Sequence, residues 1–537
     1  AALRAAIAEI GGRVVRSWWI VDALAVSLPP GTGPEVLRSL PGVGRVDPNN
    51  LVLGTSIGAQ PIEHAISTLG HNTAAAHVGG YTGSARGGQS YQSIAVLDAE
   101  LLAAVTTAPA AYRHHGVLRV GGAPTAASRV IADAQVGSSV NSTVPFDHGN
   151  AVAAIAAGAR LTGGTTFTGA SNGHAPGADL VSVNVAVATP AAAYPGNANP
   201  QLLPPISDAV TLLSAWQWVL ANRATYGIRV AVNSFGGDPN PAAPVQQALD
   251  ACADVGDIVV VVPSGNEGNS RIGSLPGVPN PCWDSQYAAN GVAVAAAGAH
   301  TRAVPSWVSN APLTPANTVQ PLGSSNLPTP AGYERQYPDM VAAGLDMVLP
   351  FHTNEAAFTM NSGTSMAAPN VAGSAFLWLV GPDGAAVLPA RTALMARAAM
   401  LASAEASGFL RSDWLTVDST SLGAVQDQVT SNPTTGSTYT RMLPVVAGKT
   451  YSVAVAWKRT DYSTNPDWAN LDLAVTMAGA SLGSSASAVG AGNVGVRRTW
   501  ERVVFTAPSS GTVAIDVVFT HVPTGAAVTH AFAATEL

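Results

Sequence analysis

The chain has 537 residues, too many for one ordinary domain, and this length favours two to four domains. Apolar residues make up 47% of it, so a sizeable core can form, whereas charged residues make up 11% and the formal net charge is −7. The absence of a basic run argues against binding to nucleic acid. The apolar stretches end well short of the ~18–20 residues that span a bilayer, so no membrane segment is expected.

The composition also favours a secreted, extracellular protein, because it is poor in Lys and rich in Ala, Gly, Ser, Thr and Asn. No basic segment followed by an apolar one opens the chain, so a signal peptide is expected to be removed or never to have been present. Cys252 and Cys282 are too few for a disulfide framework or a cysteine-built zinc site. They either form one bridge, as an oxidising compartment permits, or remain two buried thiols.

The first part of the chain, residues 1–54, is predicted to form a small α+β module. Its pattern indicates helices at 2–10 and 34–40, strands at 12–17 and 23–28, and an extended piece at 43–53. A loop of mostly small residues follows at 54–61.

From about Tyr91 the sequence alternates between strand-like and helix-like segments, which predicts an α/β domain. Apolar runs rich in β-branched residues, bounded by Gly and Pro, suit the interior strands of a mostly parallel sheet that is covered on both faces. The expected strands are 93–97, 179–187, 229–233, 258–262, 292–297 and 340–342, and the expected helices are 151–159, 206–222, 244–255, 371–380 and 388–404.

After about Thr420 the helical patterns stop, and short strand-like runs are separated by Gly, Ser, Asn and Pro. The runs at 451–457, 471–477, 499–506 and 511–519 predict an all-β antiparallel fold, either a jelly-roll-like sandwich or a barrel. The expected organisation is therefore three parts, 1–54, 55–419 and 420–537.

One stretch, Asn-Ser-Gly-Thr-Ser-Met-Ala-Ala-Pro at 361–369, places Ser365 before an apolar run that predicts a buried helix. Gly363 permits a tight turn, and Pro369 is expected in the first helical turn, where its missing N–H is not needed. Ser365 would then stand at a helix N-terminus, whose free N–H groups and dipole stabilise negative charge beside a nucleophile. The same residues could instead form a simple helix cap.

Two further segments carry groups that a nucleophilic serine needs. Asp98 ends the apolar strand at 93–97, and residues past the carboxyl ends of strands face the ligand crevice of an α/β sheet. His148 opens the small-residue helix of 151–159. Singly, each has an ordinary structural explanation, but Asp, His and Ser in this order match one known serial arrangement of the catalytic triad. Asn266, in a Gly-Asn turn after the strand at 258–262, could donate its amide to an oxyanion.

These motifs together resemble those of subtilisin-like serine proteases, the subtilase family (peptidase S8). Gly-Thr-Ser-Met-Ala-Ala-Pro at 363–369 is similar to the family's nucleophile motif, His148-Gly149 to its histidine motif and Asp98 to its aspartate motif. Gly265-Asn266-Glu267-Gly268 resembles the oxyanion-hole segment, and the segment that begins Asn233-Ser234 resembles the substrate-binding strand. The resemblance covers residues 55–410.

The resemblance implies a three-layer α/β fold and an endopeptidase that acts on proteins or peptides as a monomer. It implies that Ser365 attacks, His148 moves the proton, Asp98 orients His148, and Asn266 with the Ser365 N–H binds the oxyanion. The substrate would pair with the backbone of Ser234, Phe235 and Gly236, and Gly265 would leave the S1 wall open to apolar or aromatic side chains.

The resemblance also extends to the two ends of the chain. Residues 1–54 are similar to a subtilase propeptide, which acts as a folding aid and inhibitor, and self-cleavage is expected between about Asn50 and Gln60. The part after Thr420 resembles the C-terminal sandwich of some bacterial subtilases. Calcium is the ion expected for the family, and Asp467, Asn470 and Asp472 cluster as oxygen ligands, or as ordinary turn residues.

Two positions depart from the family pattern. Ala99-Glu100 follows Asp98 where a hydroxyl residue and glycine are usual, and Asn150 stands where Thr or Ser is usual. The Glu100 carboxylate so near Asp98 could raise the pKa of that aspartate or alter the loop. The alternative function is therefore that of a catalytically impaired binding protein with the subtilase fold. An α/β-hydrolase esterase is excluded by motif and by chain order, and His148-Gly149 disfavours a sedolisin.

Overall fold

The computed structural model describes the chain in separate segments. They are residues 2–18, 23–33, 35–43, 80–84, 92–99, 118–120, 126–137, 147–159, 173–187, 207, 209–234, 244–263, 290–298, 339–345, 347–350, 358–361, 363–383, 391–404, 427–459, 468–486 and 499–537.

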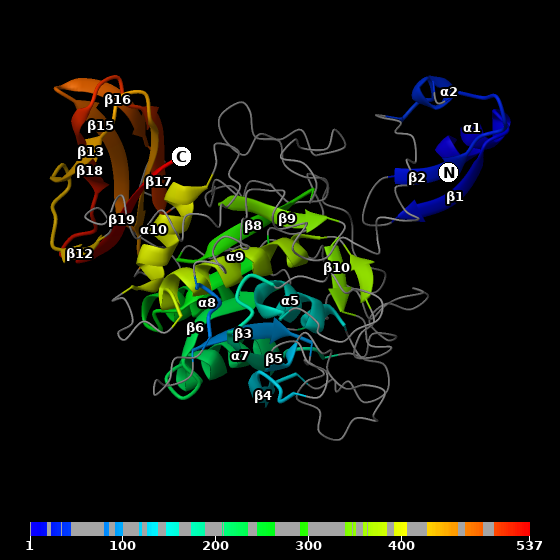
Figure 1. The fold of residues 1–537 in the computed structure, drawn as a ribbon, viewed down its shortest axis with the longest axis horizontal. Coiled ribbons are helices and arrows are strands. Elements are labelled where there is room, and N and C mark those ends of the chain that lie inside the picture. The colour runs from blue at the N-terminus through cyan, green and yellow to red at the C-terminus, as the bar shows by residue number, and fades with distance from the viewer. Residues whose placement is uncertain are drawn as a thin grey trace.

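The N-terminal segments form a small module, drawn in blue in Figure 1, that contains the expected helices and strands. Its elements are α1 (Ala2–Glu9), β1 (Arg13–Trp18), β2 (Ala23–Ser27) and α2 (Glu35–Arg38). β1 and β2 pair in an antiparallel sheet. The expected extended piece at 43–53 lies almost wholly outside the described residues.

The centre of the chain forms a seven-stranded sheet with the order β4-β5-β3-β6-β7-β8-β9, in which all neighbours are parallel. The strands are β3 (Ser93–Asp98), β4 (Val130–Gln135), β5 (Asp179–Asn184), β6 (Ile228–Asn233), β7 (Val259–Pro263), β8 (Val292–Gly298) and β9 (Met340–Leu345). The predicted parallel sheet is therefore confirmed. β4 was not expected, because this edge strand is only partly buried and its sequence is not a continuous apolar run.

Helices cover both faces of this sheet (Figure 1). Alternate residues of β3 show the two layers: Ile94 and Val96 join one core, and Ala95 and Leu97 join the other. The first core is covered by α5 (His148–Ala157), α9 (Thr364–Val380) and α10 (Ala393–Ser403), and the second by α7 (Ala209–Asn222) and α8 (Pro244–Asp254). A hairpin of β10 (Met347–Pro350) and β11 (Phe358–Asn361) precedes α9.

The C-terminal segments form two antiparallel four-stranded sheets, with the orders β12-β19-β14-β17 and β13-β18-β15-β16. The strands are β12 (Asp427–Ser431), β13 (Thr438–Val445), β14 (Thr450–Trp457), β15 (Asn470–Met477), β16 (Ala480–Ser485), β17 (Trp500–Thr506), β18 (Gly511–His521) and β19 (Val528–Glu536). These sheets enclose a core of their own, and their eight strands interleave as in a jelly roll. We call this unit the sandwich.

The sandwich also shares a core with the α/β domain. Alanines on the outer face of β14 and β19 pack with α10 in the cluster that fills the first layer of the central sheet; they are Ala454, Ala456, Ala531 and Ala533. Small side chains on both partners allow the helix and the sheet to approach closely.

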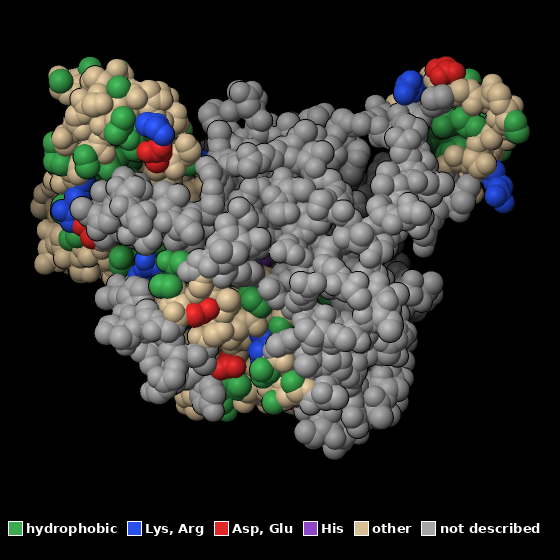
Figure 2. Space-filling model, viewed as in Figure 1, with side chains coloured by type: hydrophobic (Ala, Val, Ile, Leu, Met, Phe, Trp, Pro, Cys, Tyr) green, Lys and Arg blue, Asp and Glu red, His purple; other side chains and the backbone are tan. Residues whose placement is uncertain are grey.

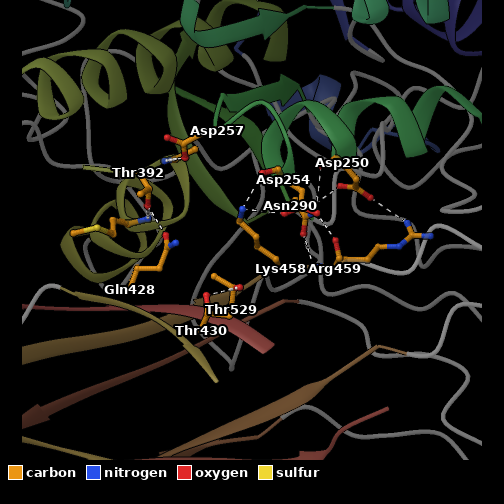
Figure 3. Close-up of polar contacts among 12 residues, drawn as sticks. Asp250, Asp254, Asp257, Asn290, Thr392, Gln428, Thr430, Lys458, Arg459 and Thr529 are labelled. Carbon is orange, nitrogen blue, oxygen red and sulfur yellow. Dashed lines mark hydrogen bonds and ion pairs between the residues drawn. The ribbon is translucent and has the colours of Figure 1, made fainter. Parts of the chain in front are cut away.

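Polar contacts surround this apolar seam, and Figure 3 shows several of them. The Thr392 hydroxyl bonds the Gln428 amide at 2.6 Å, and Lys458 forms an ion pair with Asp254 at 2.9 Å. The Trp500 indole N–H donates to the Asp339 carboxylate at 2.7 Å. The sandwich is therefore built into the α/β domain through both apolar and polar groups.

The described surface carries few charges. On the face shown in Figure 2, the side chains of Lys, Arg, Asp and Glu stand singly or in small groups, as the 11% charged composition leads one to expect. In the part of the chain that the structure describes, no helix is long and apolar enough to cross a membrane.

Candidate active site

Asp98 and His148 are in direct contact at the carboxyl edge of the sheet. Asp98 is the last residue of β3, and His148 is the first residue of α5. His148 Nδ1 lies 3.0 Å from Asp98 Oδ1 and 2.9 Å from Oδ2, and both side chains are buried. The Ala99 N–H also donates to Asp98 Oδ1 at 2.7 Å. The carboxylate therefore holds the imidazole with Nδ1 as the protonated nitrogen, which leaves Nε2 to accept a proton.

Ser365 stands at the N-terminus of α9, as the sequence predicts. It is the second residue of the helix, so its N–H is one of the first four, which have no partner within a helix. Gly363, just before the helix, has φ 154° and ψ 165°, a conformation that is essentially restricted to glycine. This turn places the hydroxyl and the N–H of Ser365 together at the start of the helix.

The helix begins earlier than expected, and this corrects the prediction for Pro369. α9 starts at Thr364, so Pro369 lies inside it, past the first turn. A proline has no N–H to donate to the carbonyl four residues before it, which here belongs to Ser365. The Ser234 hydroxyl donates to that carbonyl instead, at 3.2 Å.

The contact between these two serines is reciprocal. The Ser365 hydroxyl donates to the Ser234 carbonyl oxygen at 2.7 Å. Ser234 follows β6, and β6 pairs with β3 so that Asn233 lies beside Leu97. Since Asp98 and Ser234 follow these paired residues, the two groups end neighbouring strands at the same edge of the sheet.

The structure thus joins Asp98 to His148 and Ser365 to Ser234. The described contacts of Ser365 Oγ include Ser234 and not His148, so the hydroxyl must leave the Ser234 carbonyl before it can give its proton to Nε2. Serine–histidine hydrogen bonds often form fully only when substrate is bound. The signal for the Ser234 contact was present in the sequence, because a proline four residues after the serine leaves the serine carbonyl without its helical donor.

Several predicted site residues lie outside the described part of the chain. These are Asn266 of the oxyanion hole, Phe235, Gly236 and Gly265 of the substrate-binding segments, and Glu100. Asn150, the other departure from the family pattern, lies in the first turn of α5 and is buried.

The predicted calcium ligands are only partly described, since Asp467 falls outside the described residues. Asn470 is buried, and its Oδ1 has no hydrogen-bond partner within the described segments. Its Nδ2 donates to Thr520 Oγ1 at 2.7 Å and to Asp472 Oδ1 at 3.5 Å. An amide oxygen is one of the ligands that Ca²⁺ takes, although here the Asn470 amide nitrogen, and not its oxygen, contacts the Asp472 carboxylate. Among the described residues, no group of three His, Cys, Asp or Glu is arranged to hold a metal ion.

Of the two expectations for the cysteines, the structure contains the free thiol at Cys252, which is buried beside α7. Cys282 lies outside the described residues.

The order of these groups along the chain and their elements match one peptidase family. A family model described as the subtilase family, peptidase S8, matches residues 93–413, which is more than half of the chain. The match begins at β3 with Asp98, includes His148 and Ser365, and extends beyond α10. This chain therefore belongs to the subtilase family of serine peptidases.

Proposed function

We propose that this subtilase is a secreted endopeptidase that cleaves peptide bonds through Asp98, His148 and Ser365. Membership of the family implies protein or peptide substrates. The observation that carries the proposal is the buried Asp98–His148 pair, with both carboxylate oxygens within 3.0 Å of Nδ1. Such a pair orients the histidine as a base and stabilises the imidazolium that forms when it takes a proton.

The reaction is acyl transfer to water. Ser365 Oγ attacks the scissile carbonyl carbon, its proton passes to His148 Nε2, and the imidazolium then gives that proton to the leaving amine. A water molecule repeats the sequence on the acyl-enzyme and releases the acid. The oxyanion would be bound by the Ser365 N–H and the Asn266 amide, and loss of one such donor costs on the order of 10²–10³ in turnover in subtilisin.

Substrate would bind as an added strand along Ser234, Phe235 and Gly236, which reads the peptide backbone more than its side chains. We therefore expect broad specificity, with an apolar or aromatic preference at the open S1 wall beside Gly265. A peptide bound along Ser234 would also compete with the Ser365 hydroxyl for the Ser234 carbonyl oxygen.

The test is hydrolysis of casein or a peptide by the wild type, Ser365→Ala and Asp98→Asn. We expect no hydrolysis by Ser365→Ala and a kcat lower by about 10⁴ in Asp98→Asn, because His148 would then adopt the wrong tautomer. Unchanged hydrolysis in Ser365→Ala would refute the proposal.

The second candidate is a catalytically impaired subtilase that binds protein or carbohydrate surfaces. The Ser365–Ser234 contact at 2.7 Å favours it, because the nucleophile is held away from its base. A fluorophosphonate probe separates the two functions, since only a serine activated by His148 reacts with it. Labelling that is absent in the wild type would favour the binding protein.

We also propose that residues 1–54 are a propeptide that inhibits the enzyme. Support comes from the separate α+β module of α1, β1, β2 and α2, which Figure 1 draws clear of α5 and α9. Inhibition would require this module to dock over Ser365 before cleavage between about Asn50 and Gln60. N-terminal sequencing of incubated, active protein tests this, and a sequence starting only at Ala1 would argue against it.

A structural calcium ion held by Asp467, Asn470 and Asp472 is a further proposal, supported by the unbonded Oδ1 of buried Asn470. Such an ion would bind oxygen atoms of Asn470 and Asp472 in β15 and of Asp467 before it, and so would link the strand to the preceding segment. A chelator is then expected to lower the melting temperature, and an unchanged melting temperature would exclude the site.

A further inference from the structure

A buried histidine outside the proposed triad connects the two helices that begin at His148 and beside Ser365. His174 lies in the segment between α5 and β5, and its side chain is fully buried. Its backbone N–H donates to the Ile155 carbonyl at 3.1 Å, and the next N–H, of Ala175, donates to the Ala156 carbonyl at 2.9 Å. These carbonyls belong to the last turn of α5, where helical partners are missing, so this segment caps the helix of His148.

The His174 side chain contacts α9, the helix of Ser365. His174 Nε2 lies 2.7 Å from Asn370 Oδ1, and His174 Nδ1 lies 2.8 Å from Ser374 Oγ. Asn370 and Ser374 are also fully buried and lie one turn apart on α9. Both ring nitrogens of His174 therefore have a polar partner on the nucleophile helix.

The hydrogen bonds determine the form of the imidazole. Asn370 Nδ2 donates to the Met366 carbonyl at 2.9 Å, so the Asn370 oxygen is directed at His174 and can only accept. His174 Nε2 must then carry a proton, and in the neutral imidazole Nδ1 accepts from the Ser374 hydroxyl. The chain of contacts runs from α5 through His174 and Asn370 to the carbonyl of Met366, which is the residue after the nucleophile.

The helices meet closely at this point. A Cβ added at Gly373 would lie 2.4 Å from the Ala156 carbonyl oxygen and 2.5 Å from His174 Cβ. Only glycine allows α9 to pack this tightly on the end of α5 and on His174. Such close packing leaves α9 little freedom to move along α5 once the polar contacts of His174 are made.

We propose that His174 is a positioning residue that fixes α9 relative to α5 and thereby sets the approach of Ser365 to His148. The inference rests on the proposed peptidase function. His174 touches neither substrate nor the reacting atoms. It acts because the two catalytic groups stand at the starts of two helices whose relative position the His174–Asn370 contact determines.

The experiment compares His174→Leu, which keeps a similar volume without the hydrogen bonds, with His174→Gln, whose amide N–H can reach Asn370. For His174→Leu we expect kcat and the rate of fluorophosphonate labelling to fall about 10–100-fold, with KM within about threefold, since small misplacements of reacting groups have effects of this size. His174→Gln should restore most of kcat.

A stability control is Asp383→Asn, at the other end of α9. The Asp383 carboxylate accepts from the Thr82 hydroxyl at 2.6 Å and from the Thr82 N–H, so this variant loosens α9 without touching the seam with α5. We expect it to lower the melting temperature and to leave kcat unchanged at temperatures well below melting.

If His174→Leu does not fold, Asn370→Ala provides the same test, and Ser374→Ala, which leaves the Asn370 contact intact, should change kcat less than Asn370→Ala. Unchanged kcat and labelling in folded His174→Leu, or no recovery in His174→Gln, would refute the positioning role and leave the peptidase assignment intact. A wild type that neither hydrolyses peptides nor reacts with the probe would overturn both.

Discussion

Arg459 of the sandwich and Asp250 of α8 form an ion pair, with Nη1 and Oδ2 3.1 Å apart and both side chains fully buried. Asn290 completes the contact, because it accepts from the Arg459 N–H at 2.6 Å and donates to the Arg459 carbonyl at 2.8 Å. The Arg459 guanidinium also stacks over the Trp468 ring at 4.3 Å. Figure 3 shows Asp250, Asn290 and Arg459 at the junction of the two domains.

Removal of one member of this pair is expected to be costly. Arg459→Met leaves the Asp250 carboxylate buried without its countercharge, and we expect the free energy of unfolding to fall by about 3–5 kcal/mol. The double variant with Asp250→Leu should recover most of this loss, because an apolar pair of similar volume carries no desolvation cost. Urea denaturation of the single and double variants provides the measurement.

The same variant should leave KM for a peptide substrate unchanged. Asn290 precedes β8, and Asp339, which bonds Trp500, precedes β9, so this part of the junction lies at the amino ends of parallel strands. Asp98 and Ser234 lie at the opposite, carboxyl edge. A large change in KM for folded Arg459→Met would show that the junction is coupled to the substrate site.

Ser234 and Pro369 give a second pair of linked changes. Ser234→Ala leaves the Ser365 carbonyl without a donor, and we expect a loss of about 1–3 kcal/mol in stability together with a lower kcat. Pro369→Ala supplies a helical N–H to that carbonyl, so the double variant should be more stable than Ser234→Ala alone. Melting temperatures and peptide kinetics of the two single variants and the double variant provide the test. Strictly additive effects of the two substitutions would contradict a shared role of Ser234 and Pro369 at the Ser365 carbonyl.

His530 makes the sandwich sensitive to acid. Its ring is buried between Tyr439 and Phe519, and neither ring nitrogen has a hydrogen-bond partner among the described residues. Burial, with a smaller effect of the Arg441 charge, lowers the pKa of His530 to about 4 from an ordinary 6.5. The unfolded chain therefore binds the proton first, and stability falls as the pH drops from 6.5 to 4, by about 3 kcal/mol in all.

The measurement is urea denaturation of the wild type and His530→Phe between pH 7 and pH 4. The variant should lose about 3 kcal/mol less over this range, because no proton can bind at that position. Equal pH dependence in the two proteins would show that other groups cause the acid sensitivity.

Cys252 is expected to be inert in the folded protein. Burial raises the pKa of its thiol to about 12, so at pH 8 only about one molecule in 10⁴ carries the reactive thiolate. In a Cys282→Ser background, a disulfide reagent should react with Cys252 only after the protein unfolds in denaturant. Rapid reaction in native buffer would place the thiol at the surface.

Much of the candidate site could be predicted, because the positions of its residues depend on local sequence. Asp98 and Ser365 are fixed by a strand end and a helix start, and the chain order of the triad followed directly. The Asp98–His148 contact is confirmed, whereas Asn266 and the segment after Ser234 stay predictions. His174 carried no local signal, since its role depends on two side chains that are about 200 residues away.

The sandwich was predicted only in part for a similar reason. The predicted strands at 451–457, 471–477, 499–506 and 511–519 correspond to β14, β15, β17 and β18, but β12, β13, β16 and β19 were missed. β19 is buried along most of its length and rich in alanine, because α10 packs on its outer face and leaves room only for small side chains. Alanine has low strand propensity, so tertiary packing here overrides the local preference.

The position of α10 has a consequence for synthesis. This helix precedes the sandwich in the chain, yet its apolar face is covered by β14 and β19, which are translated after every strand of the central sheet. A growing chain that stops before β19 holds the whole triad but exposes the alanine seam to solvent. Domains that form on the ribosome with an uncovered apolar surface are prone to aggregate and to be degraded. We therefore expect a chain truncated before β19 to aggregate more readily than a chain that includes it, because the apolar face of α10 is then uncovered.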